Sequence, residues 1–249
     1  MVLHIMKNVN VILCGYNWAG CEALRLLLSE GCHVFVYTHE SKKSDPDLAE
    51  YCEEMGIDFS LEKISVDNLP FTPDVISSIY YGYIISKDVI NSVKGKIFNL
   101  HPSLLPLYKG CGSLTWAIIN GEKKTGFTYH YIDEGCDTGD IIIQHSIDIK
   151  PFDTQQTLYQ RVMVVAMLEY RSTLYKVMQG YKGQIQKEEG SYYKRGAPHS
   201  GEISLEWGES YTKRYIRAMI SPPLPYAKFG DHEITKFSEF QSLRKKKLN

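Results

Sequence analysis

Residues 9–20, with the sequence VNVILCGYNWAG, carry the signals from which the fold is predicted. Val9 to Cys14 is a short run of apolar and β-branched residues, and Gly15 follows it directly. Residues 19–30 then carry apolar side chains at helical spacing, up to Gly31. A strand, a tight turn and a helix in this order are typical of the first half of a βαβ unit.

The same alternation continues along the chain. It predicts strands at residues 33–38, 75–85, 96–103, 127–131 and 140–145, and helices at residues 47–56 and 153–180. In the long helix we expect a buried face formed by Leu158, Val162, Val165, Leu168 and Leu174. Short apolar strands between helices indicate an α/β fold, in which a mainly parallel sheet carries helices on both faces. The right-handed crossover rule makes this a doubly wound, Rossmann-like sheet.

The composition changes near residue 190, which predicts a catalytic domain at residues 1–190 and a C-terminal extension at residues 191–249. In the extension we expect a short helix at residues 210–220 and a small β-hairpin at residues 226–237, with a Gly-Asp turn. An isolated hairpin is marginally stable in water, so it should pack on the main domain or on a partner subunit. The last residues, 244–249, are expected to form a solvated tail.

The composition argues against several classes of partner. The 249 residues include 23% charged residues and have a formal net charge of −1, so no large field of one sign attracts nucleic acid or an anionic membrane. We see no secretory signal and no apolar run near the roughly 18 residues of a membrane span, and we expect a cytoplasmic protein. The six cysteines form no C-x-x-C pair, so we expect free thiols and no metal site.

The glycine cluster at residues 15–20 has two interpretations. It follows a strand and opens a helix, but Asn17 stands where a dinucleotide fingerprint has its second glycine. Its glycines could serve a tight turn with close packing, or an anion or nucleotide could bind at the helix N-terminus. Tyr16 and Trp18 could likewise cover a ligand or simply pack.

Asn99, His101 and Asp137 are the candidate catalytic residues. Asn99 and His101 end an apolar strand, and Pro102 stiffens the chain behind the imidazole. Asp137 is expected in a loop at the mouth of a neighbouring strand, where its carboxylate would orient the imidazole and raise its pKa. An amide that stabilises an oxyanion, beside an imidazole that moves a proton, suits acyl transfer. The alternative is a structural role for all three in a non-catalytic nucleotide-binding module.

Two stretches carry a resemblance to a known family. FNLHPSLLPLYKGCG at residues 98–112, followed by TGFTYHYIDEGCDTGDIIIQ at residues 125–144, resembles the signature of folate-dependent formyltransferases. That family has an Asn-x-His-Pro-Ser-Leu-Leu-Pro segment and an Asp in an Asp-x-Gly turn about 36 residues after the His. His101 and Asp137 are 36 residues apart. The resemblance covers roughly residues 9–180.

The resemblance implies roles for particular residues. It carries the family's catalytic triad over to Asn99, His101 and Asp137, and it implies 10-formyltetrahydrofolate as the formyl donor. The pterin is then expected between the loop at residues 80–84 and the loop at residues 132–137, held largely by backbone groups. The implied folate-binding residues are Tyr80, Tyr81, Gly82, Tyr83, Ile84, Ile132, Asp133 and Gly135.

The acceptor must be inferred from the C-terminal extension. Transfer RNA would need a larger, basic C-terminal domain, and glycinamide ribonucleotide enzymes are shorter. YYKRGAPHSGEISLEW at residues 192–207 and IRAMISPPLPYAKFGDHEI at residues 216–234 resemble sugar nucleotide N-formyltransferases. These enzymes act on dTDP-linked amino-dideoxy sugars for bacterial surface polysaccharides such as the lipopolysaccharide O-antigen.

The resemblance favours dTDP-4-amino-4,6-dideoxyglucose over its 3-amino isomer, and it implies a homodimer formed through the C-terminal region. UDP-linked amino sugars and glycinamide ribonucleotide remain alternative acceptors. Aromatic and cationic side chains could stack on the base or meet the pyrophosphate. The candidates are Tyr16, Trp18, Lys109, Tyr192, Tyr193 and Arg195, each of which could equally be an ordinary surface or packing residue.

Overall fold

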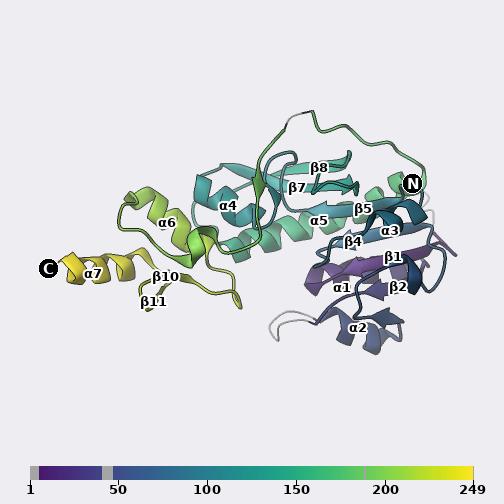
Figure 1. Cartoon of the computed structure of the whole chain (residues 1–249), viewed down its shortest axis with the longest axis horizontal. Coiled ribbons are helices and arrows are strands. Elements are labelled where there is room, and N and C mark those ends of the chain that lie inside the picture. Colours follow the sequence, from purple (N-terminus) through teal and green to yellow (C-terminus); the bar gives the residue numbers. More distant parts are fainter. Residues whose placement is uncertain (1–5, 41–46, 188, 249) are drawn as a thin grey trace. The chain divides into compact units, whose positions relative to one another are not determined.

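The computed structural model describes residues 6–40, 47–187 and 189–248. Its main sheet has seven strands in the order β3-β2-β1-β4-β5-β7-β8 (Figure 1). The strands are β1 (Asn10–Gly15), β2 (His33–Tyr37), β3 (Phe59–Ser60), β4 (Val75–Ile79), β5 (Ile97–His101), β7 (Lys124–Tyr131) and β8 (Ile141–Asp148). The pairs β1·β2, β2·β3, β1·β4 and β4·β5 are parallel, and β5·β7 is antiparallel. The predicted Rossmann-like, mainly parallel sheet is confirmed.

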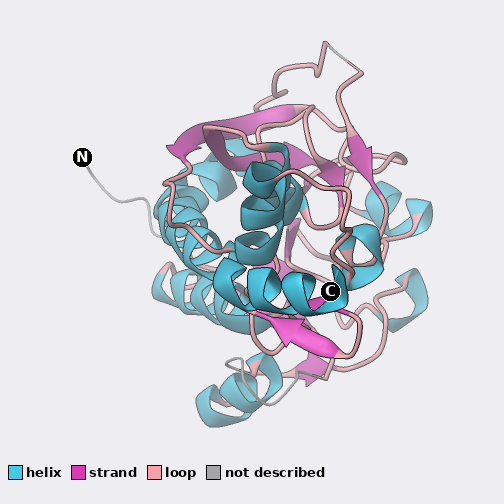
Figure 2. Cartoon of the chain, turned by 90° about the vertical axis from the view of Figure 1, so that its left-hand side faces the viewer, coloured by secondary structure: helices cyan, strands magenta, loops and turns pink. Residues whose placement is uncertain are grey.

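Helices follow most of these strands along the chain, and Figure 2 colours the helices cyan and the strands magenta. The helices are α1 (Asn17–Ser29), α2 (Leu48–Met55), α3 (Lys87–Ser92), α4 (Ser113–Asn120), α5 (Gln155–Met178), α6 (Glu209–Ala218) and α7 (Phe237–Leu248), with 3-10 turns η1 (Val66–Asn68) and η2 (Pro198–Gly201). The helix predicted at residues 47–56 illustrates the local signals. Asp47 caps it by accepting hydrogen bonds from Ala49 and Glu50, and Gly56 ends it with φ 64°.

The sheet is covered on both faces. On one face, Ile12, Ile76 and Ile97 pack against Val89 of α3. On the other, the rings of Phe98 and Tyr129 lie 6.1 and 6.3 Å from the ring of Tyr170 in α5. The Tyr170 hydroxyl, fully buried, donates a 2.9 Å hydrogen bond to Ser77. A strand that is buried on both faces can therefore carry apolar side chains without alternation, as Val11 to Cys14 of β1 do.

The glycines at residues 15 and 20 are explained by close packing. A Cβ at Gly20 would lie 3.2 Å from the carbonyl carbon of Gly15 and 2.9 Å from a methyl group of Leu48. Asn17 has φ 54°, and its side chain accepts a hydrogen bond from the Ala19 N–H. Close packing thus accounts for both glycines of the strand-to-helix turn that the sequence predicts.

The chain divides into two compact units that are each discontinuous in sequence. Unit 1 comprises residues 1–101, 128–144 and 164–188, and unit 2 comprises residues 102–127, 145–163 and 189–249. The boundary predicted near residue 190 stays a prediction.

Unit 2 contains two small sheets. β6 (Lys109–Gly110) pairs in parallel with β9 (Tyr192–Tyr193), and β10 (Ala227–Phe229) pairs in an antiparallel manner with β11 (His232–Ile234). The second pair is the predicted C-terminal hairpin. It packs on α7, where the rings of Phe229 and Phe240 lie 5.1 Å apart and Phe240 is buried.

The strand predicted within residues 75–85 ends at Ile79, and the loop expected at residues 80–84 begins with Tyr80, which adopts a left-handed backbone with φ 62°. Two other local predictions are wrong. The tail predicted from residue 244 belongs to α7, whose last turn carries Lys245, Lys246 and Lys247. Positive side chains at a helix C-terminus are favourable, so this basic sequence suits a helix end.

The second wrong prediction concerns the buried face of α5. Leu158, Val162 and Leu174 are buried as expected, but Val165 is only half-buried and Leu168 is 76% exposed. Met167 occupies the inward position instead. Leu168, the next residue, lies about 100° further around the helix and therefore faces outward.

No helix in the described part of the chain is long and apolar enough to cross a membrane. All six cysteines are free thiols, as predicted.

Candidate active site

Three neighbouring strands place Ser78, Asn99 and His130 side by side in unit 1. The sheet register pairs Ser78 of β4 with Asn99 of β5, and Asn99 with His130 of β7. The Ser78 hydroxyl donates a 3.0 Å hydrogen bond to Oδ1 of Asn99, whose Nδ2 lies 3.2 Å from Nε2 of His130. His130 is 2% exposed, whereas Asn99 is half-buried. The amide of Asn99 is thus held on both sides and remains accessible.

His101 and Asp137 join this row. His101 lies two residues beyond Asn99 on β5 and therefore faces the same side of the sheet. Its Nδ1 is 3.5 Å from Oδ2 of Asp137, and Oδ1 of Asp137 is 3.5 Å from Nε2 of His130. The side chains of His101 and Asp137 are 6% and 13% exposed. One carboxylate therefore lies between two buried imidazoles, and the structure brings all three predicted catalytic residues together.

Asp137 reaches this position by a route that the sequence did not predict. Because β5 and β7 are antiparallel, β7 ends beside the start of β5, where the Ile132 N–H donates a 3.0 Å bond to the Ile97 carbonyl. As expected, Asp137 lies in the loop that follows a neighbouring strand, β7. The segment from Ile132 folds back, so that Asp137 lies beside His101 at the far end of β5.

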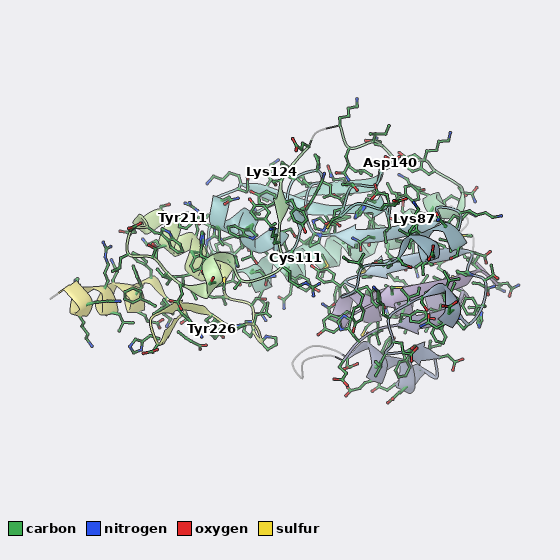
Figure 3. All side chains as sticks on the ribbon, in the orientation of Figure 1. Lys87, Cys111, Lys124, Asp140, Tyr211 and Tyr226 are labelled. Carbon is green, nitrogen blue, oxygen red and sulfur yellow. The ribbon has the colours of Figure 1, made fainter. Side chains whose placement is uncertain are left out.

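Hydrogen bonds fix this returning loop, residues 132–139. Oδ1 of Asp133 accepts bonds from the Gly135 N–H at 3.0 Å and the Thr138 hydroxyl at 2.7 Å. Figure 3 labels two further anchors: the Lys87 ammonium lies 2.6 Å from the carboxylate of Glu134, and the Asp140 carbonyl accepts a 2.9 Å bond from Tyr131. The carboxylate of Asp133 therefore stabilises the loop by hydrogen bonds within it.

Gln186 holds the catalytic end of the loop. Its side-chain amide donates two bonds, at 2.9 Å to the Asp137 carbonyl and at 2.8 Å to the Gly139 carbonyl. Asp137 has φ 54°, a strained conformation for a residue with a side chain. A clamp on the flanking carbonyls stabilises that conformation and so the position of the carboxylate.

The loop after β4 carries the other predicted folate residues, from Tyr80 to Ile84. The Tyr81 hydroxyl accepts a 3.0 Å bond from the Ile64 N–H, and burial raises the pKa of Tyr81, so the phenol stays protonated. Tyr83 and Ile84 are 44% and 86% exposed. Exposed aromatic and aliphatic side chains such as these are what a flat heteroaromatic ligand would cover.

The predicted acceptor residues are divided between the two units. In unit 1, the ring of Tyr16 stacks on His39 at 4.1 Å, and Trp18 is 37% exposed. In unit 2, the β6·β9 ladder pairs Lys109 with Tyr192.

The unit 2 candidates differ in exposure. Tyr192 is 57% exposed, and Arg195 is also exposed. Tyr193 instead stacks on Trp116 at 4.7 Å and accepts a bond from Asn120. Tyr193 is therefore engaged in packing, whereas most of the Tyr192 surface faces solvent.

Sequence reasoning missed three residues of the site: Ser78, His130 and Gln186. His130 could have been found, because alternation along the predicted strand at residues 127–131 puts it on one face with Thr128. Neither Ser78 nor Gln186 belongs to a motif. Within the described residues, no group of three His, Cys, Asp or Glu side chains could hold a metal.

A family model described as "Formyl transferase" matches residues 10–173. GDP-perosamine N-formyltransferase from Brucella melitensis is 36% identical over 231 residues, which cover 90% of this chain and 89% of that protein.

Solved structures share the fold. An N-formyltransferase from Helicobacter canadensis, in complex with folinic acid and dTDP-3-aminofucose, has a TM-score of 0.78 and 22% identity, over 92% of this chain and 87% of that chain. A 4-N formyltransferase from Francisella tularensis has a TM-score of 0.74 and 23% identity, over 92% of this chain and 94% of that chain. With Asn99, His101 and Asp137 assembled as the sequence predicts, this chain belongs to the formyl transferase family, in its sugar nucleotide N-formyltransferase branch.

Proposed function

We propose that the protein transfers a formyl group from 10-formyltetrahydrofolate to the amino group of a nucleotide-linked amino-dideoxy sugar. The observation that carries this proposal is a row of contacts in unit 1. The amide of Asn99 lies 3.2 Å from the imidazole of His130, and the carboxylate of Asp137 lies 3.5 Å from the imidazoles of both His130 and His101. Such a set serves acyl transfer, in which an oxyanion develops and a proton must move.

Each residue has a distinct task in this reaction. The acceptor amine attacks the formyl carbon while an N–H of Asn99 stabilises the negative charge on the formyl oxygen. His101 stabilises that charge or relays the proton of the amine towards the departing folate nitrogen. Asp137, 3.5 Å from the imidazole of His101, orients the ring and favours its charged form. When the carbon–nitrogen bond to folate breaks, the proton lost by the amine balances the new N–H of tetrahydrofolate.

The loops at residues 80–84 and 132–137 are the proposed folate site. Support comes from the exposed side chains of Tyr83 and Ile84 and from the hydrogen-bonded rigidity of the second loop. A rigid loop offers backbone groups to a pterin without an ordering cost. The folinic acid bound to the Helicobacter canadensis protein agrees with a folate donor.

Two acceptors are proposed for direct comparison. The sequence favours dTDP-4-amino-4,6-dideoxyglucose, whereas the 36% identity over 90% of the chain favours GDP-perosamine, a 4-amino-4,6-dideoxymannose nucleotide. Both offer an amine at sugar position 4, and they differ in the base and in the configuration at carbon 2. Lys109 and Tyr192, paired on β6 and β9, are the proposed contacts for pyrophosphate and base.

The test is an incubation with 10-formyltetrahydrofolate and a panel of amines, read by mass spectrometry. The panel holds dTDP-4-amino-4,6-dideoxyglucose, GDP-perosamine, a dTDP-3-amino sugar, a UDP-linked amino sugar and glycinamide ribonucleotide. We expect a formylated product and stoichiometric tetrahydrofolate from one of the first two. Formylation of glycinamide ribonucleotide alone would overturn the proposal.

Three further properties belong to the same proposal: a cytoplasmic location, a role in bacterial surface polysaccharide synthesis, and a homodimer formed through the C-terminal region. The hairpin packs on α7 within one chain, so the dimer is not needed to bury it. Light scattering after size exclusion, on the full chain and on a variant shortened before α7, tests the dimer.

A further inference from the structure

The hydrogen bonds around Asn99 fix which end of its amide faces which neighbour. Nδ1 of His130 lies 2.7 Å from the carbonyl oxygen of Tyr131. A carbonyl can only accept, so Nδ1 carries a proton. In the neutral ring Nε2 is then bare, and a bare nitrogen can only accept a hydrogen bond.

The amide of Asn99 must therefore present a donor to Nε2 of His130. Nδ2 of Asn99 lies 3.2 Å from Nε2 of His130 and can donate to it, while Oδ1 accepts the 3.0 Å bond from Ser78. If the amide turned over, its oxygen would face the lone pair of Nε2, and two acceptors would be buried against each other. An unmatched buried polar pair of this kind is costly.

The orientation of the amide matters because Asn99 has two N–H groups and His130 accepts a hydrogen bond from only one of them. The second stays available to the formyl oxygen, in a side chain that is half-buried and so reachable. In the turned-over amide an oxygen lone pair would replace a donor, and it would repel a developing oxyanion instead of stabilising it.

We propose that His130, with Ser78, is a positioning residue that fixes the amide of Asn99 so that an N–H is available to the reacting formyl oxygen. This inference rests on the proposed function. His130 makes its contribution through Asn99 and does not touch the substrate. The register places the three side chains on adjacent strands, so they are aligned before any substrate binds.

One competing state is possible for the same atoms. If His130 were a cation, its Nε2–H would point at Oδ1 of Asp137, 3.5 Å away, and Asn99 would have to turn over. The ring of His101 lies 6.5 Å from that of His130 and also faces Asp137. Two imidazolium rings at this separation repel each other, and the reaction uses the charge on His101.

A spectroscopic test separates the two states without any substrate. Long-range proton–nitrogen NMR spectra of the labelled protein report the protonation of each ring nitrogen, and the signals of His130 are assigned among the eight histidines by their loss in His130→Gln. Near pH 7.5 we expect Nδ1 to carry the proton and Nε2 to be bare. A protonated Nε2 would overturn the proposal even if the enzyme formylates its sugar as proposed.

A kinetic test uses two variants of similar polarity but different reach. A glutamine side chain can place an oxygen near the position of Nε2 and accept from Asn99, whereas an asparagine reaches only the position of Nδ1. We expect His130→Asn to lower kcat about 10²-fold, as for the loss of one oxyanion donor. His130→Gln should stay within about tenfold of wild type, because the critical hydrogen bond is retained. The KM values for both substrates should not change.

The controls exclude a merely structural effect. His33→Asn, at an exposed position of β2, should leave turnover unchanged. In an Asn99→Ala background, His130→Asn should add no further loss, because the side chain that it positions is gone. Equal losses in His130→Gln and His130→Asn, or additive losses with Asn99→Ala, would contradict the positioning role. If wild type formylated no amine, the proposed function would fail, and the NMR result would still stand as a test of the geometry.

Discussion

The formyl-transfer site and the candidate acceptor surface are built by different means. The site in unit 1 depends on the register of three strands of five to eight residues, and its side chains are mostly buried and held by hydrogen bonds on several sides. The candidate acceptor residues in unit 2 rest on a ladder of two residues per strand, and Tyr192 is 57% exposed.

This difference has a chemical reason. Oxyanion stabilisation requires donors placed to within a fraction of an ångström before the reaction begins, which a sheet register provides. Binding a base and a pyrophosphate tolerates looser, exposed side chains, because stacking and ionic contacts change gradually with geometry. Substitutions should therefore affect the rate of chemistry in unit 1 and the affinity for the acceptor in unit 2.

The largest effect is expected from the catalytic residues themselves. His101→Ala and Asp137→Ala should each lower kcat by about 10²- to 10⁴-fold, because one removes the proton relay and the other its orienting charge. Single-turnover assays with saturating donor and acceptor measure the loss, and circular dichroism checks the fold. His232→Ala, at an exposed position of the hairpin, is the matched control. Turnover like that of wild type in either catalytic variant would refute the assigned roles.

The sequence predicted much of this site, because its residues follow strand and turn signals that are local. Asn99 and His101 end a predicted strand, and Asp137 lies in a recognisable Asp-x-Gly turn. What the sequence could not supply was the direction of β7. A parallel neighbour would present its loop at the end of β5, but the antiparallel pairing makes residues 132–137 fold back towards it.

Long-range contacts account for the other gaps. Gln186 comes from a segment that carries no motif, and its bonds to residues 137 and 139 arise only when the chain is folded. The end of β4 at Ile79 depends on the left-handed backbone of Tyr80, a residue type that is otherwise common in strands. Neither feature follows from local propensity.

The second largest effect tests whether Asp137 needs its clamp. Gln186→Met keeps the length of the side chain but removes both N–H donors, so the Asp137 and Gly139 carbonyls lose their partners. We expect kcat to fall about tenfold, consistent with the loss of buried hydrogen bonds, and the KM values to stay unchanged. Gln184→Met, at an exposed position of the same segment, is the control. A fall in donor or acceptor affinity instead would show that the segment binds substrate.

A smaller effect is expected at the acceptor surface, on affinity rather than rate. Tyr192→Ala should raise the KM for the sugar nucleotide about tenfold, the size expected for one lost base–aromatic stack, with little change in kcat. Steady-state kinetics with the acceptor identified by the amine panel measure it. Tyr175→Ala, an exposed aromatic of α5 in unit 1, should have no effect. If Tyr192→Ala lowered kcat alone, the assignment of rate effects to unit 1 and of acceptor affinity to unit 2 would be wrong.

The smallest effect is expected at Leu168, on the outward face of α5. Because its side chain is 76% exposed, Leu168→Ser should change the free energy of unfolding by no more than about 0.5 kcal/mol. Leu174→Ala is the matched comparison, since Leu174 is 1% exposed and its truncation should cost about 2 to 5 kcal/mol. Urea unfolding of both variants gives the values. A large loss of stability in Leu168→Ser would mean that this face of α5 is buried in solution, by a second copy or another partner. The stability of unit 1 would then depend on contacts with another chain as well as on its own sheet.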